Sequence, residues 1–202
     1  MSGKIPYSVL KGGAFSEWEL TIRESYNLNG LYKVMHDFMV DNDWVDLNGG
    51  NDFESYYHEV HLPGGAIDHN IWWRAMRDPK LEQKRSIKFL KFYLKLEFKT
   101  VMMSKKEVII SGAKQKVDSG EIRITARFYL HANWGEKDSE WQKNPILSFF
   151  ANRFWNRINK GVFGAAKGEI IQASQDLYQL IQIYTGMRPE TSKAFMQPKL
   201  ES

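Results

Sequence analysis

The stretch Ile87–Val101 alternates between apolar and mostly polar residues, and this pattern constrains the fold more than any other feature of the sequence. Its apolar positions are Leu90, Phe92, Leu94, Leu96 and Phe98. Successive side chains of a β-strand point to opposite faces of the sheet, so one face of this strand is buried and the other is solvated. Glu121–His131 and Phe15–Arg23 alternate in the same way. A sheet with one apolar and one polar face is typically antiparallel.

Three shorter segments are also predicted to be strands. Phe53–Leu62 is rich in Tyr, Phe and Val and ends at a Pro-Gly-Gly turn, and Ile71–Arg77 follows it. This pair is typical of a hairpin with a long loop. Glu107–Ser111 is short, apolar and followed by Gly112. The sequence therefore predicts about six strands.

Two segments have the periodicity of helices. Residues 28–41 carry apolar side chains three or four positions apart, behind Asn27 as an N-cap. From Asn144-Pro145 to Tyr184 every gap between apolar residues is again three or four, and Gly186 ends the pattern. Three glycines lie in the middle of this second segment, at positions 161, 164 and 168. Since glycine weakens a helix interior by roughly 1 kcal/mol relative to alanine, we expect a bend there.

The fold class predicted by these elements is α+β. We expect a curved antiparallel sheet of about six strands wrapped around a long C-terminal helix. Residues 14–186 form a single domain in this interpretation. Residues 1–13 and 187–202 contain few periodic apolar positions, and we expect a flexible N-terminal segment and a flexible C-terminal tail.

The order of strand, helix, several antiparallel strands and long C-terminal helix resembles the helix-grip fold of the START-like superfamily, which includes polyketide cyclases and Bet v 1-like proteins. The resemblance covers about residues 14–186 and rests on element order. It implies a space between sheet and helix that holds an apolar ligand. The chain departs from the family in having one helix after the first strand where many members have two, and it lacks a clear glycine-rich loop.

The composition excludes several classes of site. The chain has no cysteine, which rules out disulfides, thiolate metal sites and a cysteine nucleophile, and it favours a cytoplasmic location. No signal-peptide pattern or run of about 20 apolar residues is present, so we expect no transmembrane segment. No linear motif for nucleotide, cofactor or zinc binding occurs. His58 and His61 are three residues apart and would point to opposite faces of a strand, so we predict neither a metal site nor a cofactor.

The first hypothesis is a non-catalytic binding protein for an apolar or amphipathic small molecule. Aromatic residues make up 14% of the chain, enough to fill a thick core or to line a cavity. The pocket would lie between sheet and long helix, with Glu169 turned toward it from the helix. Trp73 would close one side, and the other lining residues would be Leu94, Leu96, Phe98, Ile124, Phe128, Phe154, Ile158 and Ile170.

The first alternative is a nucleic-acid or anionic-surface adaptor that uses the basic region 84–99. This region holds Lys84, Arg85, Lys88, Lys91, Lys95 and Lys99, with Phe89 and Tyr93 among them. Binders of single-stranded nucleic acid place rings and cations together on one sheet face. The competing interpretation is a solvated outer face balanced by Glu17, Glu19, Glu97 and Glu121, because the net charge of the chain is only +4.

The second alternative is a cyclase-like or hydrolase-like enzyme that uses the same cavity, with Glu169 or a histidine as acid–base group. No catalytic residue is predicted. In the string Trp72-Trp73-Arg74 the two rings point to opposite faces of the sheet. We expect one ring inside and the other stacked on Arg74 or a neighbour.

Overall fold

The computed structural model describes residues 4–23, 26–80, 90–110, 113–132, 144, 146 and 160–186. Along the chain the elements are α1 (Tyr7–Lys11), β1 (Ser16–Ile22), α2 (Leu28–Asp41), β2 (Glu54–His61), β3 (Ile67–Arg77), β4 (Leu90–Ile110), β5 (Ala113–Ala132) and α5 (Lys160–Thr185). The structure therefore has the predicted α+β class.

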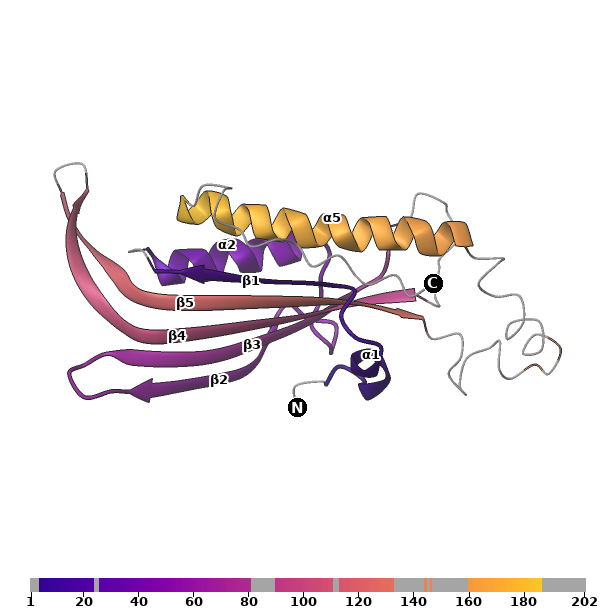
Figure 1. Ribbon diagram of the computed structural model, residues 1–202, viewed down its shortest axis with the longest axis horizontal. Coiled ribbons are helices and arrows are strands. Elements are labelled where there is room, and N and C mark those ends of the chain that lie inside the picture. Colours follow the sequence, from indigo (N-terminus) through magenta and orange to yellow (C-terminus); the bar gives the residue numbers. More distant parts are fainter. Residues whose placement is uncertain are drawn as a thin grey trace.

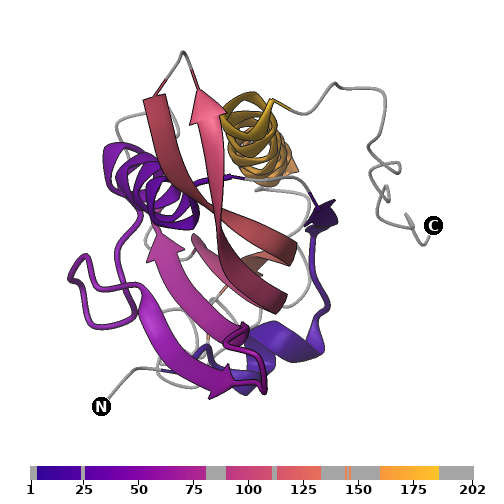
Figure 2. The same cartoon turned by 90° about the vertical axis from the view of Figure 1, so that its left-hand side faces the viewer.

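One antiparallel sheet forms the centre of the molecule. Its strand order is β1-β5-β4-β3-β2. Strands β2 to β5 form a meander, and β1 pairs with β5, the last strand in the chain. Helices α2 and α5 lie side by side on one face of this sheet, which we call the inner face (Figures 1 and 2). The opposite face is called the outer face.

The described residues form five strands, whereas the sequence predicts about six. The difference arises because segment 107–111 is not a separate strand but the continuation of β4. A β-bulge between Val101 and Ser104 interrupts the pairing with β5, and Met102 has a positive φ of 54°. A bulge bends a strand without ending it, and Figure 1 shows both β4 and β5 curving beyond this point toward the side of the helices.

Helix α5 is continuous over its 26 described residues, and its ribbon shows no sharp kink (Figure 1). The three glycines where a bend was predicted, Gly161, Gly164 and Gly168, therefore cause no sharp kink in this part of the helix, and a gentler curvature stays a prediction. A Cβ added at any of the three would meet no described atom within 4 Å, so none of these glycines serves a close approach to the sheet. The predicted start of the helix near residue 145 and the tail 187–202 lie outside the described helix.

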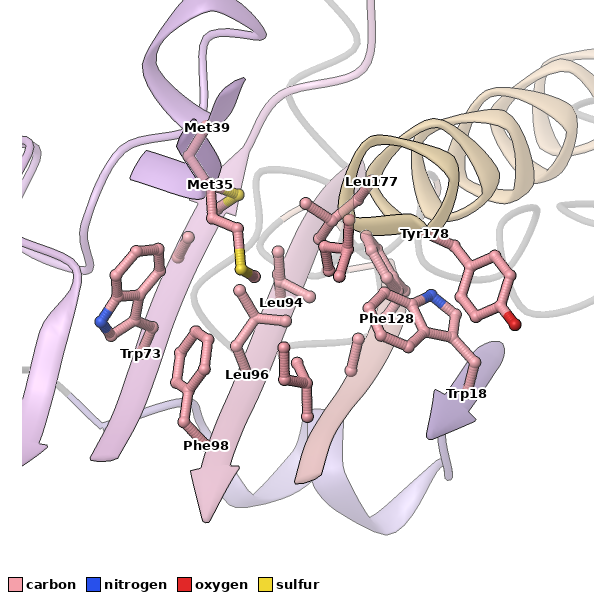
Figure 3. Packing of buried hydrophobic residues seen from close by; sticks show 14 of the residues in the cluster. Trp18, Met35, Met39, Trp73, Leu94, Leu96, Phe98, Phe128, Leu177 and Tyr178 are labelled. Carbon is pink, nitrogen blue, oxygen red and sulfur yellow. The ribbon is translucent and has the colours of Figure 1, made fainter. Parts of the chain in front are cut away.

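The core lies between the inner face of the sheet and the two helices. Trp18, Leu20 and Ile22 of β1 alternate with exposed or half-buried neighbours, as the sequence predicts. From the helices, Met35 and Met39 of α2 and Leu177 of α5 complete the cluster (Figure 3). Trp44, Trp73, Phe53, Phe92 and Phe128 are among its largest fully buried side chains, so the core accounts for much of the aromatic content.

A second, smaller cluster covers part of the outer face. The segment 1–13, expected to be flexible, contains α1 and places Ile5 and Val9 against Tyr93 and Tyr129 of the sheet. All four side chains are buried. The outer face is thus divided into a part covered by α1 and a part that reaches the solvent.

Candidate functional site

The predicted pocket residues that the structure describes gather in the core. Each of them has at most 2% of its surface exposed: Trp73, Leu94, Leu96, Phe98, Ile124, Phe128 and Ile170. Figure 3 shows several of them packed against one another beneath α2 and α5. Such burial is typical of a close-packed interior. Phe154 and Ile158 lie outside the described residues, and the pocket itself stays a prediction.

Trp73 is held by rings from two other elements. Its ring centroid lies 4.5 Å from that of Tyr32 on α2 and 5.1 Å from that of Phe98 on β4, both edge to face. Its indole N–H donates to the Tyr32 hydroxyl at 2.7 Å, and that hydroxyl donates to the carboxylate of Glu54. Burial, together with the hydrogen bond to Glu54, raises the pKa of Tyr32 above its ordinary value. The contacts satisfy the buried indole N–H, as a core tryptophan requires.

Glu169 does not stand free beside a cavity, because protein groups engage its carboxylate. Nη2 of Arg77 donates to Oε1 of Glu169 at 2.7 Å, and the backbone N–H of Lys80 lies 2.9 Å from each carboxylate oxygen. The side chain of Arg77 is 5% exposed and that of Glu169 is 20% exposed. These contacts support a structural role for the residue predicted to face the ligand.

Arg77 is the buried charge that the sequence interpretation missed. Its guanidinium carbon lies 5.0 Å from the ring centroid of Trp44 and 5.5 Å from that of Phe92, and Nη1 donates to the Asn42 carbonyl at 3.1 Å. Burial lowers the pKa of Arg77 below its ordinary value, and the carboxylate of Glu169 offsets only part of this shift. Nε has no hydrogen-bond partner among the described residues. The guanidinium therefore joins β3, the end of α2 and the long helix.

The open part of the outer face carries a row of rings. Tyr56 of β2 stands opposite Trp72 of β3 in the strand register, with ring centroids 4.6 Å apart. His58, two residues after Tyr56, stacks on it with centroids 6.3 Å apart and an interplanar angle of 23°. Tyr56 is 39% exposed, His58 is exposed and Trp72 is half-buried. We call these three residues the ring row.

Cations and an amide surround Trp72. The guanidinium of Arg74 lies 5.9 Å from the Trp72 ring centroid, and Nζ of Lys95 lies 5.3 Å from it. The indole N–H donates to Oδ1 of Asn70 at 3.0 Å. Lys99, opposite Asn70 in the register, is exposed. Because Lys95 also pairs with Glu97 at 2.6 Å, the positive charge at the border of the ring row comes mainly from Arg74 and Lys99, and this arrangement suits an anionic ligand with flat rings.

The part of the outer face toward β1 is different, because ion pairs dominate it. Arg127 bonds Glu17 at 2.7 Å and Glu97 at 2.6 Å. Arg123 lies 3.5 Å from both Glu19 and Glu121. Although burial raises the pKa of Glu97, hydrogen bonds from Lys95 and Arg127 bring it below its ordinary value. The carboxylates thus balance this part of the face, as the solvated-face interpretation predicts.

The predicted basic region 84–99 is only partly described. Lys91, Lys95 and Lys99 occupy outer-face positions of β4, whereas Lys84, Arg85, Lys88 and Phe89 lie outside the described residues. Tyr93, predicted to lie among the cations as an interacting ring, is buried beneath α1. The rings near these cations are instead Trp72 and Tyr56. The string Trp72-Trp73-Arg74 was the available signal, because one of its rings had to face outward.

Within the described ranges no three histidine, cysteine or acidic side chains lie close enough to hold a metal ion. In the same ranges no helix has the length and apolarity to cross a membrane. No protein family model matches the chain, and no curated protein or solved structure is significantly similar to it.

Proposed function

We propose that the protein binds single-stranded nucleic acid on the open part of its outer sheet face. The observation that carries the proposal is the contact between the Tyr56 and Trp72 rings, whose centroids lie 4.6 Å apart with the planes tilted by 33°, with Arg74 and Lys95 within 6 Å of the Trp72 ring centroid. Aromatic rings stack on the flat faces of bases, and cations bind phosphates. Both are needed for a strand that exposes its bases.

The expected affinity for a single strand follows from the energy of base stacking on aromatic rings. Base–aromatic stacking contributes about 1–3 kcal/mol per base and discriminates little between sequences. The ring row offers Tyr56 and His58 as the more exposed surfaces, with Trp72 supporting them from β3. We therefore expect modest affinity, weak sequence preference and clear dependence on salt.

Three other proposals remain beside this one. The helix-grip arrangement and its START-like kinship are supported by a sheet whose first strand pairs with its last and by a long C-terminal helix on the inner face. A ligand between sheet and helix stays a prediction that native mass spectrometry of the purified protein tests. The cytoplasmic location inferred from the lack of cysteine is likewise a prediction.

The class of ligand is tested by titrating the protein against four labelled probes. These are single-stranded RNA, single-stranded DNA, a duplex of the same sequence and anionic phospholipid vesicles. We expect both single strands to bind more tightly than the duplex, because the duplex hides the base faces. Equal binding of strand and duplex would mean that only charge is recognised. Binding of vesicles alone would replace the nucleic-acid proposal with an anionic-membrane one.

A further inference from the structure

Strand β2 forms one edge of the sheet. It pairs with β3 along Glu54–His61, and in the described part of the chain no strand pairs with its other side. Both faces of β2 are largely open, since six of its eight residues are exposed and the other two are half-buried. An edge with free backbone N–H and C=O groups is a template for another strand.

The two edges of the sheet differ in how they are protected. On the outer face β1 carries Glu17 and Glu19, which take part in ion pairs with arginines of β5. At the corresponding outer-face positions β2 carries Tyr56, His58 and Val60. Neither strand contains Lys, Arg or Pro, so the difference lies in the carboxylates, which β1 carries on its outer face and β2 does not carry among Tyr56, His58 and Val60. Of these two edges, β2 is therefore the better suited to pairing with another strand.

We propose that β2 pairs with the β2 strand of a second copy of this chain, antiparallel and about a two-fold axis at His58. A two-fold axis perpendicular to the sheet keeps the outer faces of both copies on the same side. Residues that oppose each other must then belong to the same face, so the axis must lie midway between one residue and the same residue of the second copy.

The side chains of β2 favour His58 as the centre. In that register Tyr56 opposes Val60 of the second copy, and aromatic–β-branched pairs stabilise antiparallel strands. Tyr57 opposes Glu59 of the second copy, so the hydrogen bond that the Tyr57 hydroxyl donates to Glu59 at 2.7 Å within the chain can be exchanged for the same bond across the axis. An axis at Glu59 would instead place two carboxylates opposite each other, which is unfavourable.

The expected dimer is weak, and it has a consequence for ligand binding. An interface confined to one strand buries less than the roughly 1,200 Å² of stable complexes, so the dimer should dissociate on dilution. Its two outer faces would form one surface, and the two ring rows would meet at His58. This consequence rests on the proposed function, whereas the dimer itself does not.

The test is sedimentation equilibrium of the full chain without nucleic acid over a wide concentration range. We expect a dimer fraction that rises with concentration. His58→Lys and His58→Glu should each weaken association by about fivefold, because like charges then face each other at the axis. An equal mixture of the two variants should recover association, because opposite charges then meet.

The control is Val101→Lys, which adds a charge at an exposed site on a different strand, β4, and should leave association unchanged. Thermal unfolding of each variant checks that the fold is kept. A wild-type chain that stays monomeric at every concentration overturns the proposal. Failure of the mixture to recover association overturns the register, and wild-type-like association of His58→Lys does so too.

Discussion

Nη2 of Arg77 and Oε1 of Glu169 lie 2.7 Å apart at the junction of the sheet and the long helix. Arg77 ends β3, and its guanidinium lies between the rings of Trp44 and Phe92. A buried cation of this kind is costly unless a carboxylate compensates its charge. Glu169 therefore fixes the position of α5 on the sheet.

Replacing Glu169 by Gln should lower the free energy of unfolding by about 3 kcal/mol, since the change leaves the charge of Arg77 uncompensated in the interior. Urea denaturation measures the difference. The matched control is Glu19→Gln, which removes a carboxylate that is 54% exposed and lies 3.5 Å from Arg123. That change should cost less than about 1 kcal/mol. Equal losses in the two variants would contradict a structural role for the buried pair.

Gly30 of α2 should not tolerate a side chain without rearrangement of Tyr184. A Cβ at position 30 would lie 2.0 Å from the Tyr184 hydroxyl, which donates to the Asn27 carbonyl at 3.3 Å. Alanine normally stabilises a helix interior by about 1 kcal/mol relative to glycine. We expect Gly168→Ala, where the added Cβ meets open space, to show this gain and Gly30→Ala to lose it. Thermal unfolding of the two variants compares them, and a similar gain in both would contradict the close packing of α2 on α5.

Arg74 should contribute directly to the salt dependence of nucleic-acid binding. Its guanidinium lies over Trp72, and no ion pair to it is found among the described residues. If Arg74 contacts one phosphate, Arg74→Gln should reduce the slope of log affinity against log salt by about 0.7. Arg123→Gln is the control, because Glu19 and Glu121 already balance that arginine. A larger change in the control than in Arg74→Gln would place the ligand elsewhere on the sheet.

The sequence predicted the buried faces of β1, β4 and β5 because burial of one face imposes a period of two. Leu94, Leu96 and Phe98 were assigned to the buried face for this reason, and the structure buries them fully. The same argument placed Lys95 and Lys99 on the outer face, where the register has them. The bulge after Val101 could not be predicted, because it interrupts the pairing without a turn residue in the strand.

The ring row could not be predicted, because it depends on register. Tyr56 and Trp72 lie sixteen positions apart, and only the hairpin pairing places them opposite each other. Periodicity could not predict on which face of the sheet Tyr56 lies, since β2 is mostly exposed on both sides and has no apolar alternation. Arg77 was missed for the opposite reason. A charged residue at the end of a strand is usually solvated, and its burial depends on Trp44 and Glu169, which lie far away in the sequence.

The central claim is that the outer face binds single-stranded nucleic acid, and two adjacent tyrosines of β2 test it most directly. Tyr56 lies on the outer face and is 39% exposed, whereas Tyr57 points to the other side and is 49% exposed. The measurement is the affinity of Tyr56→Ala and Tyr57→Ala for a labelled single strand by fluorescence anisotropy. We expect Tyr56→Ala to bind about tenfold more weakly than the wild type and Tyr57→Ala to bind like it. Equal affinity of all three proteins, or a loss confined to Tyr57→Ala, would contradict the claim.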